Sequence, residues 1–229
     1  MSAVDIPRSY PCADWRPVSY TGEAGVLRER RGWILHVVVG NGSPWGTFQG
    51  ATSPNRRFSH LWVSKKGRWE QYQRLDRASW AQAGGNGLWW SVETEGFDDE
   101  PLTEAQLDAL AAWHVWCGAP DIVADSPDGR GIGTHRMGGA AWGGHECPGK
   151  IRAGQRGEII RRAMLLRSGG KPEEVKDVNL TDRVDKPDDG QQITVAQAIR
   201  GAYMQALKNA AVLRELEARV ARIEKNTTK

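Results

Sequence analysis

The residues Trp33–Val39 (WILHVVV) form a short apolar run that is interrupted only by His36. Continuous runs of this kind, rich in β-branched residues, are typical of strands that are buried on both faces. Such strands lie in the interior of a sheet rather than at its edge. The run therefore predicts a central strand with a histidine inside it, and the rest of the fold must supply its neighbours.

Further strands are predicted on either side of a tight turn. Two alternating segments, His60–Ser64 and Trp69–Arg74, flank Lys65–Arg68, where Gly67 suits the positive φ of a hairpin turn. Ser91–Gly96 is a further strand candidate, and Asp121–Ala124 is a weak one. These segments supply partners for the central strand.

Helix signals alternate with the strands. Thr103 followed by Gln106 is a capping box in front of an apolar periodic stretch, which predicts a helix that ends near Cys117 with Gly118 as its stop. Gln155–Arg167 has the pattern of a basic amphipathic helix. We therefore expect an α/β fold with a mixed central β-sheet flanked by helices.

The chain is expected to comprise a globular domain over 1–168, a polar linker over 169–191 and a C-terminal helix over 192–229. Apolar residues in that helix recur in alternating steps of four and three, which favours a parallel coiled coil over 193–225 and a homo-oligomer. The alternative is a helix that folds back onto the globular domain. The seam residues are Val195, Ile199, Ala202, Ala206, Asn209, Leu213, Leu216, Val220 and Ile223.

Charge and hydropathy limit the partners. The net charge of +3 suits a polyanion, but no recognisable nucleic-acid-binding motif accompanies it, so we expect no nucleic-acid partner. We find neither an apolar run of about 18 residues nor, in Met1–Asp14, the layout of a secretory signal. A cytoplasmic protein without a transmembrane segment is expected.

The 11 tryptophans either line a binding groove or pack the core.

Three residues form a candidate metal site. Catalytic zinc takes three protein ligands and leaves a fourth position for water. His36 in the predicted strand, His135 in GIGTH and Cys147 in HECPG have suitable side chains. Taken alone, the same residues are also compatible with a hydrogen-bonded core histidine and an inert buried thiol.

The order of motifs resembles the type-2 N-acetylmuramoyl-L-alanine amidase and peptidoglycan recognition protein family, over roughly residues 30 to 165. The motifs are ILHVVVG, FSHLWVSKKGRWEQYQ, NGLWWSVETEG, LTEAQLDAL, GIGTHR and HECPG. The resemblance implies Zn²⁺ bound by His36, His135 and Cys147. It also implies hydrolysis of the bond between N-acetylmuramic acid and L-alanine in bacterial peptidoglycan.

The same resemblance implies the other site residues. Glu93 matches the family's acidic residue and is expected to transfer protons, with Glu95 as the alternative because it lies on the same strand face. His145, where relatives often carry Lys or Thr, is expected to donate a hydrogen bond to the oxyanion, and the alternative is that it replaces Cys147 as a ligand. Ser59 stands where many relatives have Tyr.

Substrate contacts are expected from His60, Asn86, Trp89 and Trp90, whereas His114 is assigned to helix packing. The enzyme is expected to be a phage endolysin that is released to the wall through a separate holin-type pore. Two alternatives stay open, a cytoplasmic amidase that recycles wall fragments and a module that binds peptidoglycan without cutting it. Retention of all three ligand residues disfavours the pure binder.

Overall fold

The computed structural model describes residues 8–168, 183–185 and 192–194. The chain divides into two compact units, Met1–Val178 and Asn179–Lys229. In the first unit a mixed six-stranded sheet has the order β1-β4-β3-β5-β2-β6. Neighbouring strands in the sheet run parallel to each other, except for β3 and β4, which form the antiparallel hairpin. The strands are β1 Ala13–Trp15, β2 Gly32–Val37, β3 Leu61–Val63, β4 Trp69–Gln71, β5 Trp90–Thr94 and β6 Gly131–Thr134.

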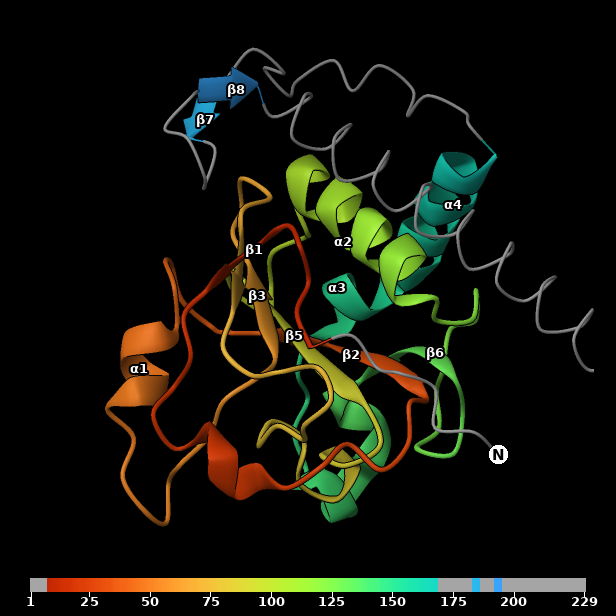
Figure 1. Ribbon diagram of the computed structural model, residues 1–229. Coiled ribbons are helices and arrows are strands. Elements are labelled where there is room, and N and C mark those ends of the chain that lie inside the picture. The colour runs from red at the N-terminus through yellow and green to blue at the C-terminus, as the bar shows by residue number, and fades with distance from the viewer. Residues whose placement is uncertain (1–7, 169–182, 186–191, 195–229) are drawn as a thin grey trace, which may run out of the picture. The chain divides into compact units, whose positions relative to one another are not determined.

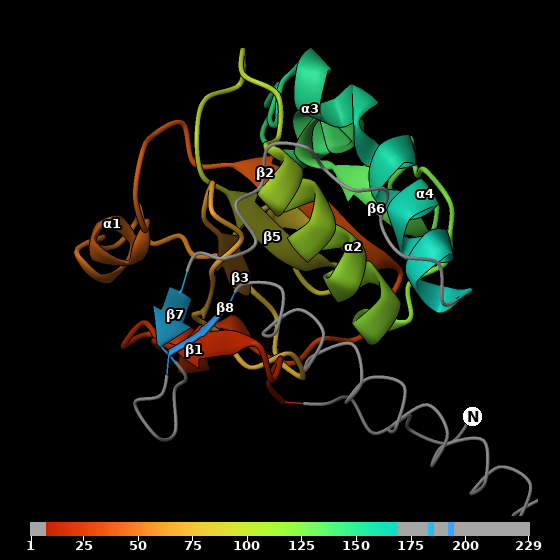
Figure 2. The same ribbon diagram turned by 90° about the horizontal axis from the view of Figure 1, so that it is seen from above.

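The expected fold class is confirmed, with β2 inside the sheet between β5 and β6. Helices and 3-10 turns lie between these strands and after the last of them. They are η1 Thr21–Ala24, α1 Trp45–Gln49, η2 Ala83–Gly85, α2 Glu104–Cys117, η3 His135–Trp142, α3 Lys150–Gly154 and α4 Arg156–Arg167. The views in Figures 1 and 2 place α2 and α4 side by side, away from α1, and these two helices pack against each other.

Helix α2 covers one face of the sheet through aromatic side chains. The Trp33 indole Nε1 donates a hydrogen bond to Nδ1 of His114 on α2 at 3.1 Å, as expected for a packing histidine. Trp90 meets Trp113 edge-on, with ring centroids 5.4 Å apart. Both side chains of each pair are buried. Aromatic packing therefore joins α2 to this face of the sheet.

The opposite face is divided between two small cores. In strands, side chains alternate between faces, so Ile34 and His36 point away from Trp33. Ile34 packs with Trp89 and Trp142, whereas Trp62 packs with Phe48 of α1. His36 and Glu93 share this face, since they pair in register across β2 and β5.

The predicted helix and hairpin boundaries agree with the structure. The Thr103 side chain accepts a hydrogen bond from the Gln106 backbone and the reciprocal bond is present, so the capping box forms, and Gly118 ends α2 in the left-handed conformation. Gly67 has a φ of 78° in the turn between β3 and β4. A residue with a side chain would be strained in this backbone conformation, which is why the turn has glycine at this position.

Several short elements were not predicted, among them two strands and a helix. β1, β6 and α1 are short, and the Gly131–Thr134 segment lacks both alternation and a run of β-branched residues. The weak strand expected at Asp121–Ala124 is reduced to a single bridge between Val123 and Ile132. Tertiary pairing decides segments this short, because each contributes few ladder bonds of its own.

In the second unit, β7 (Arg183–Asp185) pairs antiparallel with β8 (Gln192–Thr194). β7 lies within the expected linker, and β8 occupies the first residues of the expected helix. The β-branched residues Val184 and Ile193, which pair with each other, favour a strand at these positions. The remainder of the predicted coiled coil, from Val195 onward, lies outside the described residues and stays a prediction. No helix among the described residues is both long and apolar enough to cross a membrane.

Candidate metal centre

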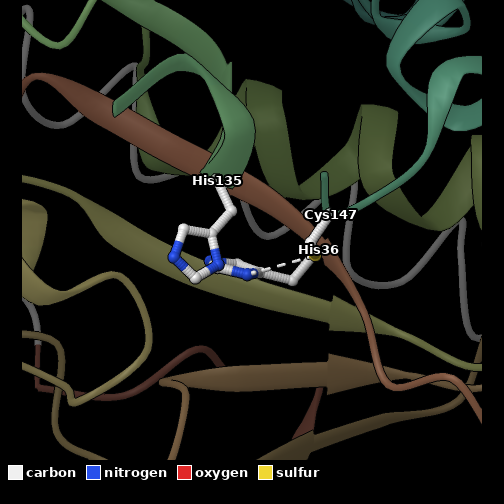
Figure 3. A group of neighbouring side chains, drawn as sticks. All are labelled: His36, His135 and Cys147. Atoms are coloured by element: carbon white, nitrogen blue, oxygen red, sulfur yellow. Dashed lines mark hydrogen bonds between the residues drawn. The ribbon is translucent and has the colours of Figure 1, made fainter. Parts of the chain in front are cut away.

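Two strand ends and one loop bring His36, His135 and Cys147 together. His36 lies at the carboxyl end of β2, His135 directly follows β6, and Cys147 lies in the loop before α3. In open sheets, ligands bind beyond the carboxyl ends of parallel strands, which is where these side chains meet. Figure 3 shows them converging, and one ligand atom from each lies within 4.8 Å of the others.

The donor set fits a metal such as zinc. Zn–N bonds near 2.0 Å and Zn–S bonds near 2.3 Å in a tetrahedron place neighbouring ligand atoms about 3.3–3.8 Å apart. The Cys147 Sγ lies 3.6 Å from Nδ1 of His36, within that range. The rings of His36 and His135 have centroids 5.0 Å apart. Two imidazoles and a thiol leave a fourth position open, which is the composition of a catalytic rather than a structural site.

Burial gives these groups different protonation tendencies. Desolvation lowers the pKa of both His36 and His135, well below the usual value for His36, so both rings are neutral at pH 7 and have a lone pair for a metal. Desolvation raises the pKa of the Cys147 thiol. A bound cation reverses that effect, because metal coordination deprotonates a thiol.

Backbone contacts hold Cys147 in place. Its Sγ accepts a hydrogen bond from the Val37 amide at 3.4 Å, and its carbonyl accepts one from the Arg136 amide at 3.1 Å. Gly149 has a φ of 86°, and a Cβ there would lie 2.2 Å from the carbonyl oxygen of Asp98. The glycine of the Cys-Pro-Gly motif therefore allows the loop to approach the segment after β5 closely enough to present the thiol.

Glu93 and Glu95 differ in how their carboxylates are used. The Glu93 Oε2 is buried without a hydrogen-bond partner, and burial raises the pKa of this carboxyl to about 8. Glu95 accepts hydrogen bonds from the backbone amides of Gly42 and Lys65, each at 2.7 Å, one on each oxygen. Glu95 thus joins two loops through hydrogen bonds, whereas Glu93, which pairs in register with His36, has a carboxylate oxygen without a hydrogen-bond partner.

His145 lies beside the three candidate ligands. Its ring stacks on that of His135, with centroids 4.7 Å apart and an angle of 27° between the planes. The residue is exposed, in contrast to the buried His36 and His135. This position combines access from solvent with closeness to the candidate metal site.

Three of the expected substrate contacts lie in the core. His60, Trp89 and Trp90 are each 0% exposed. His60 is held by the Ser91 hydroxyl on one ring nitrogen and donates to the Arg77 carbonyl with the other. The two tryptophans after Asn86 are thus packed in the interior, and contact of these three residues with a substrate stays a prediction.

Asn86 has a mainly structural role. Its Oδ1 accepts hydrogen bonds from the backbone amides of Ala81 and Gln82, which shapes the turn that contains η2. The residue also lines an open cavity of about 400 Å³, together with Val26, Arg28 and Trp80. Asn86 is thus the one expected substrate residue that adjoins open space.

The sequence analysis missed the hydrogen-bond partners of the two histidines. Gln82 Oε1 lies 3.2 Å from Nε2 of His36, and the Trp142 carbonyl oxygen lies 2.7 Å from Nε2 of His135. Gln82 comes from a loop distant in the chain, and the second partner is a backbone atom. No motif or spacing in the sequence points to either.

The model of the family described as N-acetylmuramoyl-L-alanine amidase matches residues 27–150. Significant matches to curated protein sequences are absent. The fold is similar to that of N-acetylmuramoyl-L-alanine amidase LysC from Clostridium intestinale, with a TM-score of 0.52 and 16% identity over 70% of this chain and 99% of that chain.

Two further structures are similar. The Staphylococcus aureus hydrolase AmiA, in complex with its ligand, gives a TM-score of 0.52 and 18% identity over 70% of this chain and 87% of that chain. A selenomethionine derivative of AmpD gives a TM-score of 0.50 and 20% identity over 66% of this chain and 96% of that chain. At these identities the similarity shows the shared fold.

Proposed function

The chain belongs to the N-acetylmuramoyl-L-alanine amidase family, and from that premise we propose that it is a zinc enzyme. It hydrolyses the amide bond between N-acetylmuramic acid and L-alanine in bacterial peptidoglycan. The observation that carries the proposal is the convergence of His36, His135 and Cys147, whose donor atoms lie within 4.8 Å of one another. A protein that only bound peptidoglycan would not need this donor set.

His36, His135 and Cys147 hold the zinc in this proposal. When bound, zinc supplies Lewis acidity toward the amide carbonyl and lowers the pKa of water in its open position. The two buried imidazoles are neutral and the thiolate supplies one negative charge, so the ligand set only partly neutralises the ion. The site keeps the positive charge that the reaction uses.

Glu93 is the proposed proton-transfer group. Amide hydrolysis requires a group that takes a proton from the attacking water and later delivers one to the leaving nitrogen. The unpartnered Glu93 Oε2 is the atom for this role, and a pKa raised to about 8 by burial favours its proton-bearing form. A cation at the neighbouring ligands lowers this pKa toward neutrality, where a carboxyl both accepts and releases a proton.

His145 is proposed to stabilise the developing oxyanion. An N–H of its exposed ring donates a hydrogen bond to the carbonyl oxygen as that atom gains charge. Its stacking on His135 keeps the ring beside the candidate metal ligands. Glu95 is not part of the proposed chemistry, because both of its oxygens are engaged by backbone amides.

The test is to incubate the purified protein with bacterial cell walls and to follow new L-alanine amino termini by amine labelling and mass spectrometry. We expect such termini to appear, to vanish with a chelator and to return with zinc. Binding to walls without any new amino terminus would contradict the proposal and favour the non-catalytic module. Cys147→Ser serves as the matched negative control.

The endolysin role stays a prediction, and the same assay tests it with two substrates. An endolysin cuts intact wall sacculi, whereas a recycling amidase prefers soluble wall fragments. Rates measured on both forms at equal stem-peptide concentration distinguish the two.

A further inference from the structure

We infer that Gln82 is a positioning residue, which sets the tautomer of His36 so that Nδ1 faces the candidate metal position. The inference rests on the proposed function for the identity of the metal. Its structural basis is the hydrogen bond between the Gln82 side chain and the His36 ring, 3.2 Å long. Gln82 is 0% exposed, so it has no contact with solvent and none with a substrate.

The direction of that hydrogen bond follows from the other contacts of Gln82. Its Nε2 lies 3.2 Å from the carbonyl oxygen of Trp89 and 3.5 Å from that of Gly85. Carbonyl oxygens only accept hydrogen bonds, so the NH₂ group of the amide must face them. The amide oxygen is left facing His36, and Nε2 of His36 must therefore be the N–H donor.

A neutral imidazole has one N–H and one lone pair. With the proton on Nε2, the lone pair of His36 is on Nδ1, the atom that lies 3.6 Å from the Cys147 Sγ. The other described hydrogen-bond contact of this ring, from Nδ1 to the Cys147 Sγ, can run in either direction because a thiol both donates and accepts, whereas the Gln82 oxygen only accepts. Gln82 thus decides which nitrogen is available as a ligand.

His135 has the same arrangement with a backbone acceptor. Its Nε2 lies 2.7 Å from the Trp142 carbonyl oxygen, which also accepts only. Nδ1 of His135 is therefore the lone-pair nitrogen as well. Because this partner is a main-chain atom, substitution of Gln82 changes the environment of one histidine and leaves the other as an internal reference.

The turn that carries Gln82 packs directly on Trp142. A Cβ at Gly85 would lie 2.6 Å from the Trp142 ring, so only glycine permits this approach. The Asn86 side chain also accepts a hydrogen bond from the backbone N–H of Gln82 at 2.8 Å. The acceptors for His36 and His135 consequently belong to one packed unit, which fixes the two rings relative to each other.

Loss of this one hydrogen bond is expected to weaken metal binding strongly. A partner on the second ring nitrogen orients a ligating histidine and raises its basicity, and its loss typically weakens metal binding by about 10- to 100-fold. We expect Gln82→Met to show such a loss, because methionine has a similar length but no amide. Gln71→Met is the matched control, since Gln71 is 1% exposed and hydrogen-bonded at three sites on the other sheet face.

The experiment has two readouts on the full chain. Long-range ¹⁵N–¹H NMR of the metal-free protein reports the tautomer of each histidine, and chelator competition reports zinc affinity. We expect His36 to be protonated on Nε2 in the wild type and in Gln71→Met, and to lose this preference in Gln82→Met while His135 keeps it. We expect zinc affinity to fall about 10- to 100-fold only in Gln82→Met.

A third variant, Gln82→Glu, retains an acceptor oxygen toward His36. We expect it to keep the Nε2-protonated tautomer and to bind zinc more tightly than Gln82→Met, even where it lowers the melting temperature. Equal losses in Gln82→Glu and Gln82→Met, or an unchanged His36 tautomer in Gln82→Met, would overturn the inference. Absence of zinc binding by the wild type would instead contradict the proposed function, while the tautomers still decide the role of Gln82.

Discussion

His36 and Glu93 occupy paired positions on the neighbouring parallel strands β2 and β5. Paired residues share a sheet face, so the candidate ligand and the unpartnered carboxylate are one strand spacing apart, about 4.8 Å. Glu93 pairs in turn with Trp62 of β3, which packs into the core beside α1. The strand register therefore places the Glu93 side chain between the candidate metal ligand His36 on one neighbouring strand and the Trp62 indole on the other.

Substitutions of Glu93 on β5 and of Glu95 directly after it should have different effects, the first on the reaction rate and the second on stability. We expect Glu93→Gln to keep zinc and the fold but to lose about 10²- to 10⁴-fold in rate, because it removes a proton-transfer group. Glu95→Gln should retain more activity and show a lower melting temperature, because a carboxylate that binds two backbone amides is weakened. Steady-state rates and thermal unfolding of both variants check this, and near-wild-type rates in both would refute a carboxylate in proton transfer.

Zinc content should depend on Cys147 and not on His145. We expect about one zinc per chain in the wild type, loss of zinc in Cys147→Ser, and retention of zinc with a reduced rate in His145→Ala. Elemental analysis after gel filtration measures this. If Cys147→Ser retained zinc and His145→Ala lost it, His145 rather than Cys147 would be the third ligand.

The helix cap at Thr103 should contribute measurably to stability. Thr103→Ala removes the cap bond to Gln106 and the hydrogen bond from the Thr103 hydroxyl to the Lys65 carbonyl. Loss of an N-cap typically costs about 0.5–2 kcal/mol. We expect a lower melting temperature and lower urea midpoint than in Thr52→Ala, a control at an exposed position. Equal midpoints for the two variants would show that the cap is dispensable.

Stability should fall in acid as Glu158 protonates. The guanidinium groups of Arg161 and Arg162 hold the pKa of Glu158 at about 2. A carboxyl with a lowered pKa stabilises the fold above its unfolded value, near 4.3, and loses that contribution as the pH falls toward 2. Urea unfolding between pH 5 and about 2 should therefore show a flatter pH dependence for Glu158→Gln than for the wild type or Asp99→Asn. Parallel curves for all three proteins would contradict this role.

The C-terminal seam predicts oligomerisation. If residues 193–225 form a parallel coiled coil, the full chain should be an oligomer in light scattering, and a chain ending at Ser168 should be an active monomer. Binding to a repetitive polymer would then gain from several linked catalytic domains. A monomeric full-length protein would refute the coiled coil.

Local sequence rules predicted the elements that depend on local contacts. The Thr103 capping box, the Gly118 stop and the Gly67 turn each require particular residues at fixed offsets, and all three occur in the structure. β6 was missed because Gly131–Thr134 becomes a strand only through its pairing with β2. The same distinction explains why the burial of Trp89 and Trp90 was not predicted, because local sequence does not show which indole side chains the tertiary fold buries.

The candidate site shows a similar limit. His36, His135 and Cys147 were found through motif order, and the structure brings these three together. Gln82 was missed, because its contact with His36 depends on how a distant loop packs. Hydrogen-bond partners of ligands follow from tertiary geometry rather than from spacing along the chain.

The central place of β2 between β5 and β6 has a consequence for how the chain acquires its site. Both neighbours are parallel to β2, so each pairing closes a long crossover, and such non-local pairings form slowly. His36 emerges from the ribosome early but meets His135 and Cys147 only after much of the first unit has been made. Zinc uptake would then be a late event in folding, and its rate would report the completion of the sheet.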